Sequence, residues 1–476
     1  MEKISKSFIV SIQTPDITDD LIELIKNYKV LGVVISEKNF DDIISLHNFI
    51  SKIKELADYN IIIGIDYFSI DSNNKIFDNI LKLPSLASIA ATNKEDYIRR
   101  HAEILSRIYK SIGINMDFSL NASFDHFNYL NTMGISSEIS KYLAFYIQTL
   151  QENGILTTIK NFPGRLEEDI YNIFSSENLE IYKKLINSNI DIIFLSNNIY
   201  ANIDKIPASI SQKFVHMLKN NLNYIGLIGA YISDVQLLGE YKLEYLIYNG
   251  LKNGVNVLYI DRNIEKLPEI INNLYKYEEI TKTIEDNYNK IEFLLKKLEV
   301  FYSQSPIEEL EQTIFQQYID QMAEEAIYVY EKKKFFPIKA KEFDIIGVVE
   351  PSKLLKEFMT QEEYSDIFTF TKYLKNYHKY IYQIVPDENT KWHEYSYIIY
   401  LIDSADNKTK NYLKTINKLD IPLIMIFVDD PQILNYYKDI DGVKIISFGF
   451  DESQRMAISK VIFGKYENQK VKNFVI

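Results

Sequence analysis

Hydrophobic residues in the first 265 positions gather into short runs that are apolar on both faces. Stretches long enough for a helix separate these runs. This alternation is typical of parallel strands that are buried on both faces and joined by helical crossovers. The runs lie at 7–12, 30–36, 60–68, 113–120, 154–162, 190–196, 224–232 and 254–261. Eight such strands in this length predict a (β/α)8 barrel of the TIM type.

The clearest helix between these runs is the segment 93–112, "NKEDYIRRHAEILSRIYKSI". Its apolar residues recur at helical spacing and form one stripe along the segment. The stripe consists of Tyr97, Ala102, Ile104, Leu105, Ile108 and Tyr109. We therefore expect this helix to pack on the outside of the barrel with the stripe facing inward.

The pattern changes after about residue 265, where charged, helical sequence continues to about 335. Within it, Ser305 is a plausible N-cap and Pro306 suits the first helical position. Four further β-branched runs follow, at 343–349, 395–403, 421–430 and 442–451. We expect a barrel domain at 1–300, a helical linker at 301–340 and a smaller α/β sandwich domain at 341–476.

Length, net charge and cysteine content exclude some classes of function and site. A chain of 476 residues exceeds one ordinary core, which agrees with two domains. The net charge of -13 argues against a nucleic-acid partner, because phosphate binding needs a clustered basic face. The sequence has no cysteine, so disulfides, thiolate metal sites and a cysteine nucleophile are excluded.

The sequence shows no pattern typical of a membrane span, a metal site or a nucleotide cofactor site. No window approaches 18 apolar residues, and the first residues are too polar for a signal peptide, so we expect no membrane span. This favours a cytoplasmic protein; a leader already removed is the alternative. The six histidines show no metal-ligand spacing and no nucleotide-binding glycine motif occurs, so we expect neither a metal nor a cofactor.

Several motifs occur together in a recognisable order. They are "GINMDF" (113–118), "GILTTIKNFPGR" (154–165), "IPASIS" (206–211), "QQYIDQMAEEAIYVYEKKKFFPI" (316–338) and "QRMAISKVIFGKY" (454–466). Their order and spacing resemble glycoside hydrolase family 3, especially its β-N-acetylhexosaminidase branch. The resemblance implies retaining hydrolysis, in which a carboxylate nucleophile and a proton donor lie close together across the glycosidic bond.

The resemblance also implies a substrate-binding set. Asp66 in "GIDYFSID" matches the sugar-binding aspartate of the family, and Lys160 matches its lysine. Asn161 and Arg165 stand where the family has histidines. We expect these four residues to bind substrate if any binding is retained, although Lys160 could instead form a structural ion pair with Asp66 or Asp169.

The catalytic positions depart from the family pattern. Tyr231 stands where the strand "YIGLIGAYISD" should bear the nucleophilic aspartate, and Asp234 follows three residues later. The general-acid motif is best matched by Asp169 in "DIY". These three are weak catalytic candidates. Tyr231 is a phenol with a pKa near 10 and so a poor acid or base, although a tyrosine nucleophile of the sialidase kind is conceivable. Asp234 lies past the expected strand end, and Asp169 stands among other loop acids.

Three functional hypotheses follow. The favoured one is a family 3-like pseudoenzyme that has lost hydrolase activity and has a binding or scaffolding role. One alternative is a divergent glycosidase that hydrolyses O-glycosyl bonds of a β-N-acetylhexosaminide or a β-glucoside. The other is a non-catalytic sugar-binding module. The corresponding partners are a carbohydrate ligand or a protein.

Overall fold

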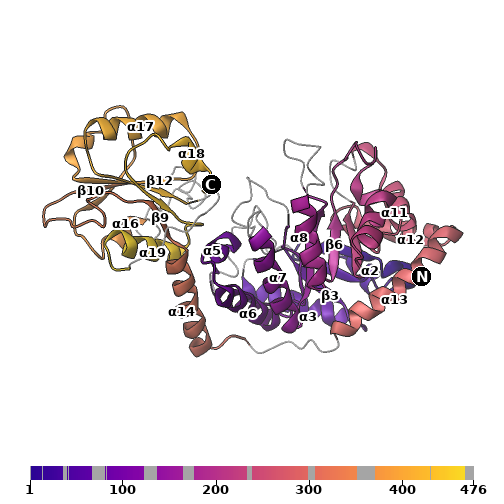
Figure 1. Ribbon diagram of the computed structural model, residues 1–476. Coiled ribbons are helices and arrows are strands. Elements are labelled where there is room, and N and C mark those ends of the chain that lie inside the picture. The colour runs from indigo at the N-terminus through magenta and orange to yellow at the C-terminus, as the bar shows by residue number, and fades with distance from the viewer. Residues whose placement is uncertain are drawn as a thin grey trace. The chain divides into compact units, whose positions relative to one another are not determined.

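The computed structural model describes most of the chain. The described residues are 2–12, 14–35, 40, 42–66, 81, 83–122, 137–164, 176–232, 239–298, 306–350, 370–428 and 430–466. Two compact units divide it: Met1–Leu81 with Ile98–Thr313, and Lys82–Tyr97 with Ile314–Ile476 (Figure 1). The expected domain boundaries at 300 and 340 stay predictions.

The first unit is a closed barrel in which eight parallel strands follow one another in chain order. The closure is made by β1, which pairs with both β2 and β8. The strands are β1 (Phe8–Ile12), β2 (Gly32–Ile35), β3 (Ile62–Ile65), β4 (Met116–Asp117), β5 (Leu156–Phe162), β6 (Ile192–Leu195), β7 (Leu227–Tyr231) and β8 (Val257–Ile260). Each lies within a predicted run, and the predicted TIM-type barrel is confirmed.

Helices surround these strands. They are α1 (Glu2–Ser5), α2 (Asp19–Lys26), α3 (Ile43–Leu56), α6 (Glu95–Ile112), α7 (Ser137–Glu152), α8 (Ser176–Asn187), α9 (Gln212–His216), α11 (Leu243–Lys252), α12 (Leu267–Leu274) and α13 (Glu278–Leu298). Short 3₁₀ turns occur at Ala208–Ile210 and Ile264–Lys266, and a π-helical turn occurs at Met217–Asn221. The predicted helix 93–112 is α6, and every member of its apolar stripe from Ala102 onward is fully buried.

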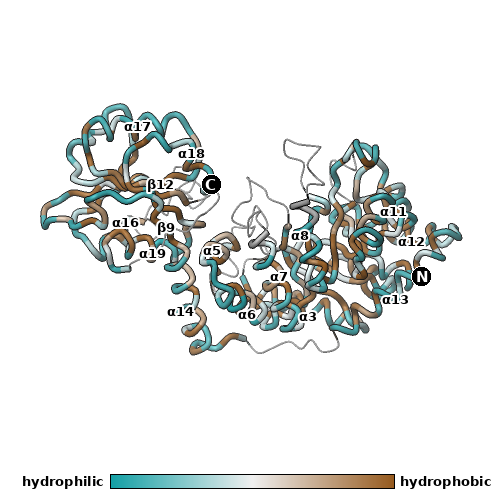
Figure 2. Tube along the Cα trace, in the orientation of Figure 1, coloured by the Kyte–Doolittle hydropathy of each residue, from teal (hydrophilic) through white to brown (hydrophobic). Residues whose placement is uncertain are grey.

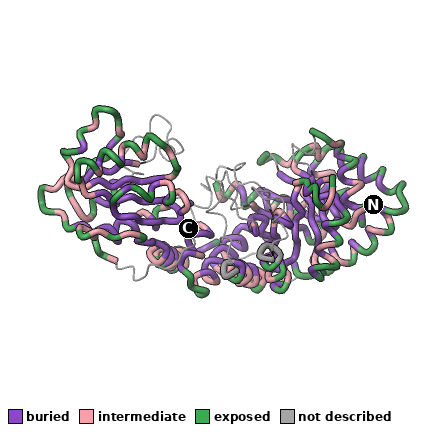
Figure 3. The backbone as a smooth tube through the Cα atoms, turned by 45° about the horizontal axis from the view of Figure 1, so that its top comes forward, coloured by how far each residue is buried: buried purple, intermediate pink, exposed green. Residues whose placement is uncertain are grey.

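Side chains of the strands fill the interior of the barrel, and residues of α13 pack against one end of it. Small and large residues alternate across neighbouring strands, and a Cβ on Gly229 would lie 2.6 Å from the Phe194 ring. At the N-terminal ends of the strands, Leu294 and Leu298 of α13 join the same apolar cluster as Leu227. Apolar residues follow the strands in each unit (Figure 2), and the strands are largely buried (Figure 3).

The second unit contains one mixed six-stranded sheet, in the order β11-β10-β12-β13-β14-β9. Its strands are β9 (Tyr328–Glu331), β10 (Ile346–Val349), β11 (Ile381–Ile384), β12 (Tyr397–Ile402), β13 (Leu423–Phe427) and β14 (Val443–Ile446). Its helices are α5 (Leu86–Ala91), most of α14 (Glu309–Ala326), α16 (Phe370–Leu374), α17 (Asn407–Lys418), α18 (Ile433–Tyr436) and α19 (Glu452–Ile462), with a 3₁₀ turn at Trp392–Glu394. The expected smaller α/β domain is thus present.

Two of these strands were not predicted. The four predicted runs contain β10, β12, β13 and β14, whereas β9 and β11 are the outer strands of the sheet. The antiparallel strand β9 lies inside the span expected to be a helical linker, so that span is helical only in part. None of the described helices is long and apolar enough to cross a bilayer.

Candidate functional site

Strand β5 ends in an irregular turn that determines where Lys160 and Asn161 lie. The register between β5 and β6 shifts between Ile159 and Phe162, which makes a bulge at the two residues between them. Asn161 has a φ of 69°, and the Phe162–Pro163 bond that follows is cis. Asparagine and histidine both tolerate a positive φ better than most residues. An asparagine can therefore replace the family histidine here without disturbing the backbone.

Asp66 and Lys160 meet at the C-terminal ends of β3 and β5. Lys160 Nζ donates to Asp66 Oδ2 over 2.8 Å, and the two side chains are 25% and 29% exposed, respectively. The ammonium also lies 5.3 Å from the centre of the Phe118 ring. Asp66 Oδ1 is buried and has no hydrogen-bond partner in the described structure. The pair is therefore partly exposed, whereas the buried oxygen of Asp66 has no donor among the described residues.

Tyr231, at the end of β7, belongs to a second polar cluster. Its hydroxyl donates to Asp261 Oδ2, and Asp261 follows β8 directly. Asp261 also accepts from Arg262, over 3.2 Å for both Nε and one terminal nitrogen, and this contact raises the pKa of the guanidinium. The Tyr231 ring lies 5.1 Å from that of Tyr259. The end of β7 thus carries a phenol that is bound to an adjacent carboxylate.

Two buried groups form the interior beneath these clusters. Burial raises the pKa of the Tyr259 phenol, and the charges of Asp66 and Asp261 act in the same direction. Asp117 is fully buried and accepts from the Ser119 backbone and hydroxyl over 2.8 and 2.6 Å and from the Tyr109 hydroxyl over 3.1 Å. Burial raises the pKa of this carboxyl as well. Asp117 therefore has a structural role inside the barrel.

The structure describes only part of the predicted site. Asp66 and Lys160 are in contact, whereas Asn161 and Tyr231 lie at the ends of β5 and β7. Arg165, Asp169 and Asp234 lie outside the described residues. Sequence reasoning missed Asp261 and Arg262. Their position directly after a predicted barrel strand was the available signal, because barrel sites are built from the C-terminal ends of strands.

The described residues supply part of the chemistry of this barrel end. Among them, the carboxylates of Asp66 and Asp261 each contact a cation. Across the described chain, no group of three or more histidine and acidic side chains could hold a metal ion. What the described residues offer here is hydrogen bonding by the Asp66 carboxylate, the Lys160 ammonium and the Tyr231 phenol.

Comparisons with known proteins agree with this architecture. The family model described as "Glycosyl hydrolase family 3 N terminal domain" matches residues 2–292. The beta-hexosaminidase of Haemophilus influenzae is 20% identical over 297 residues, which span 56% of this chain and 83% of that protein.

Solved structures share the fold. A family 3 β-N-acetylglucosaminidase from Paenibacillus has a TM-score of 0.80 at 14% identity, and the alignment covers 98% of this chain and 97% of that one. A fungal multi-domain family 3 β-N-acetylglucosaminidase has a TM-score of 0.83 at 14% identity, and 98% of this chain spans 60% of its length. The match to the family model extends over more than half of the sequence, and the chain belongs to glycosyl hydrolase family 3.

Proposed function

We propose that this family 3 protein binds a carbohydrate at the C-terminal end of its barrel and does not hydrolyse it. The observation that carries the proposal is the hydrogen bond from Tyr231 to Asp261, at the strand end where the family resemblance puts a nucleophilic carboxylate. The proposed pseudoenzyme keeps the neighbouring pair of Asp66 and Lys160 as its binding group.

The chemistry of a phenol supports the loss of hydrolysis. Most retaining glycosidases attack with a carboxylate that lies about 5–5.5 Å from a second carboxyl group. Before Tyr231 could attack a sugar it would have to lose its proton to Asp261. That transfer is uphill by about 6 pKa units between a free tyrosine and a free aspartate, or about 8 kcal/mol in water. A carboxylate nucleophile at the same position would need no such step.

The chemistry of the ion pair supports retained binding. The Asp66 side chain is 29% exposed although its Oδ1 is buried, so a sugar hydroxyl can donate to Oδ2 beside the lysine, and a neighbouring hydroxyl can accept from Lys160 Nζ. Such charge-assisted hydrogen bonds are stronger than neutral ones. The β-N-acetylhexosaminidase-like relatives make an N-acetylhexosamine the first ligand to test.

Isothermal titration calorimetry with N-acetylglucosamine and its β-1,4-linked dimer tests this proposal. We expect saturable binding by the wild type and a loss of about 10- to 100-fold in affinity for Asp66→Asn. The matched control is Asp58→Asn, which removes the exposed ion pair of Asp58 with Lys29. Absence of binding by the wild type, or equal affinity in Asp66→Asn, would overturn the proposal.

A second candidate is a divergent glycosidase, in which Asp261 would act as a base for Tyr231 through the same hydrogen bond. In that reaction the Tyr231 oxygen attacks the anomeric carbon while its proton passes to Asp261, and the glycosidic bond breaks with its electron pair on the leaving oxygen. Water then attacks the anomeric carbon and gives its proton to solvent, the bond to Tyr231 breaks, and Asp261 returns the proton to the tyrosine oxygen. An aryl glycoside is the appropriate substrate, because its phenolate leaves without a proton donor. Turnover that disappears in Tyr231→Phe would favour this candidate over the first.

A further inference from the structure

A cavity of about 590 Å³ lies at the other end of the barrel, where β6 and β7 begin. Asn189, Ile190 and Asp191 approach it from the start of β6, and the residues from Tyr224 to Leu227 approach it from the start of β7. The last three turns of α13 form its third side. The Asp66–Lys160 pair follows the C-terminal ends of its strands, so the two sites lie at opposite ends of the barrel.

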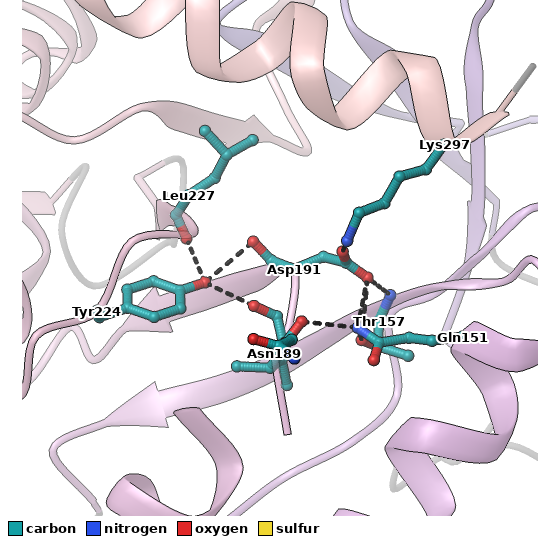
Figure 4. A network of polar contacts seen from close by, with 8 residues as sticks. Gln151, Thr157, Asn189, Asp191, Tyr224, Leu227 and Lys297 are labelled. Carbon is teal, nitrogen blue, oxygen red and sulfur yellow. Dashed lines mark hydrogen bonds and ion pairs between the residues drawn. The ribbon is translucent and has the colours of Figure 1, made fainter. Parts of the chain in front are cut away.

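The floor of this cavity is built around Asp191, whose side chain is only 1% exposed. Its Oδ2 accepts from the Thr157 backbone over 2.8 Å and from the Gln151 amide over 3.1 Å. Its Oδ1 accepts from Lys297 over 2.5 Å. Figure 4 shows Lys297 reaching down from α13 to this carboxylate. The buried charge is therefore fully paired and holds strands β5 and β6 and helix α13 together.

Tyr224 completes the floor on the opposite side of Asp191 (Figure 4). Its hydroxyl lies 2.9 Å from the Asp191 carbonyl and 3.0 Å from the Leu227 carbonyl. Burial raises the pKa of this phenol well above its ordinary value, so it remains a neutral donor. A side chain at Gly226 would collide with the Tyr224 ring, so glycine lets the chain pass directly over it. The floor is preformed.

The sides of the cavity are apolar and incompletely covered. Ile225 is 83% exposed and Phe293 is 70% exposed, although both are large hydrophobic residues. Both line this one cavity, together with the buried side chains of Ile190 and Leu294. Leaving this much apolar surface in water is unfavourable, and contiguous exposed apolar patches commonly mark binding sites.

The rim carries an excess of positive charge. Lys297 is neutralised by Asp191, but no ion pair of the described residues includes Lys290, which also lines the cavity. The charge of Lys290 also acts on the nearby Lys219. Burial is the main cause that lowers the pKa of Lys219, and repulsion from Lys290 is the second. Asp286 lies one helical turn before Lys290, and its negative charge raises the pKa of Lys219. The described ion pairs include none between Asp286 and Lys290. An anionic ligand is therefore preferred over a cationic one.

We infer that this cavity binds a small organic anion with a compact apolar body. The apolar part would cover Phe293 and Ile225, and the anionic group would lie beside Lys290. The volume falls within the range of about 300–1,000 Å³ typical of small-molecule sites. Its preformed floor suits a rigid ligand, because little ordering is required on binding. The inference is independent of carbohydrate binding at the other end of the barrel.

Fluorescence titration with 8-anilinonaphthalene-1-sulfonate tests the inference, because this probe has aromatic rings and one negative charge. N-phenyl-1-naphthylamine has the same rings without the sulfonate and measures the contribution of charge. The variants are Phe293→Ala and Lys290→Gln. Their matched controls are Phe343→Ala, at another exposed phenylalanine, and Lys282→Gln, at an exposed lysine of α13 outside the cavity.

We expect one saturable site for the sulfonate. Its affinity should fall about tenfold in Phe293→Ala and about fivefold in Lys290→Gln, and both controls should match the wild type. The neutral probe should bind more weakly and be insensitive to Lys290→Gln. Equal binding by all variants would overturn the inference. Sedimentation velocity that reveals self-association abolished by Phe293→Ala would overturn it too, because the face would then bind a second copy of the chain.

Discussion

Lys160 and Asp66, 94 residues apart in the chain, form an ion pair of 2.8 Å between the ends of β5 and β3. The bulge in β5 places the lysine, and the end of β3 places the aspartate. Because about a quarter of each side chain remains exposed, solvent weakens the attraction between the two charges. The pair is therefore better suited to binding a ligand than to stabilising the barrel.

The stability of an Asp66→Asn variant separates these two roles. A partly exposed pair contributes about 0–1 kcal/mol, so we expect the free energy of unfolding to fall by no more than about 1 kcal/mol. Urea unfolding followed by far-ultraviolet circular dichroism measures this change. A loss above about 3 kcal/mol would instead make the pair a structural element of the barrel.

The positive φ of Asn161 makes a backbone prediction. At 69°, Asn161→Gly should change stability by no more than about 0.5 kcal/mol, because glycine adopts this conformation freely. Asn161→Val should cost about 1–3 kcal/mol, because a β-branched residue is strained there. Thermal unfolding of the two variants tests the prediction, and equal stability would show that the bulge relaxes.

In the network around Asp191, replacing the aspartate should destabilise the protein more than replacing its partner Lys297. Asp191→Ala leaves the buried Thr157 backbone N–H without its acceptor and removes the carboxylate from among the acceptors of the Gln151 amide, and we expect a loss of about 2–4 kcal/mol. Lys297→Ala should cost less, about 1–2 kcal/mol: the buried carboxylate of Asp191 loses this cation, but the lysine is 42% exposed and Asp191 keeps its other donors. Urea unfolding compares the two variants, and a larger effect for Lys297→Ala would contradict this account.

Glu350, at the end of β10, should make the second unit sensitive to pH. Burial raises its pKa from 4.5 to about 7, while the Phe370 backbone donates to it over 3.0 Å. The folded state binds the proton more tightly than the unfolded state does. Stability should therefore fall as the pH rises from about 4.5 to 7, by about 3 kcal/mol, and then level off.

Glu350→Gln should remove this fall, because the amide keeps the acceptor and cannot ionise. The only tryptophan, Trp392, is buried in the second unit, so its fluorescence reports that unit during denaturation at each pH. A wild type whose stability does not fall across this range would contradict the prediction, as would a variant that retains the fall.

The barrel was predictable because its strands are buried on both faces, which leaves continuous apolar runs in the sequence. Strand β11 could not be predicted in this way, because it is an edge strand whose two central residues are exposed, so its sequence has no continuous apolar run. In the same way, family resemblance pointed to Asp66 and Lys160, whereas Asp261 matches no family motif. Asp191 resembles an ordinary loop acid, and its partners Thr157 and Lys297 are 34 and 106 residues away.

Release of 4-nitrophenol from 4-nitrophenyl N-acetyl-β-D-glucosaminide, and from the corresponding β-glucoside, tests the central claim most directly. The samples are the wild type, Tyr231→Phe and Asp66→Asn, beside heat-denatured protein. The proposed function predicts that the wild type releases no more nitrophenol than the denatured sample, while it still binds the sugar in calorimetry. Turnover by the wild type that either substitution abolishes would contradict it.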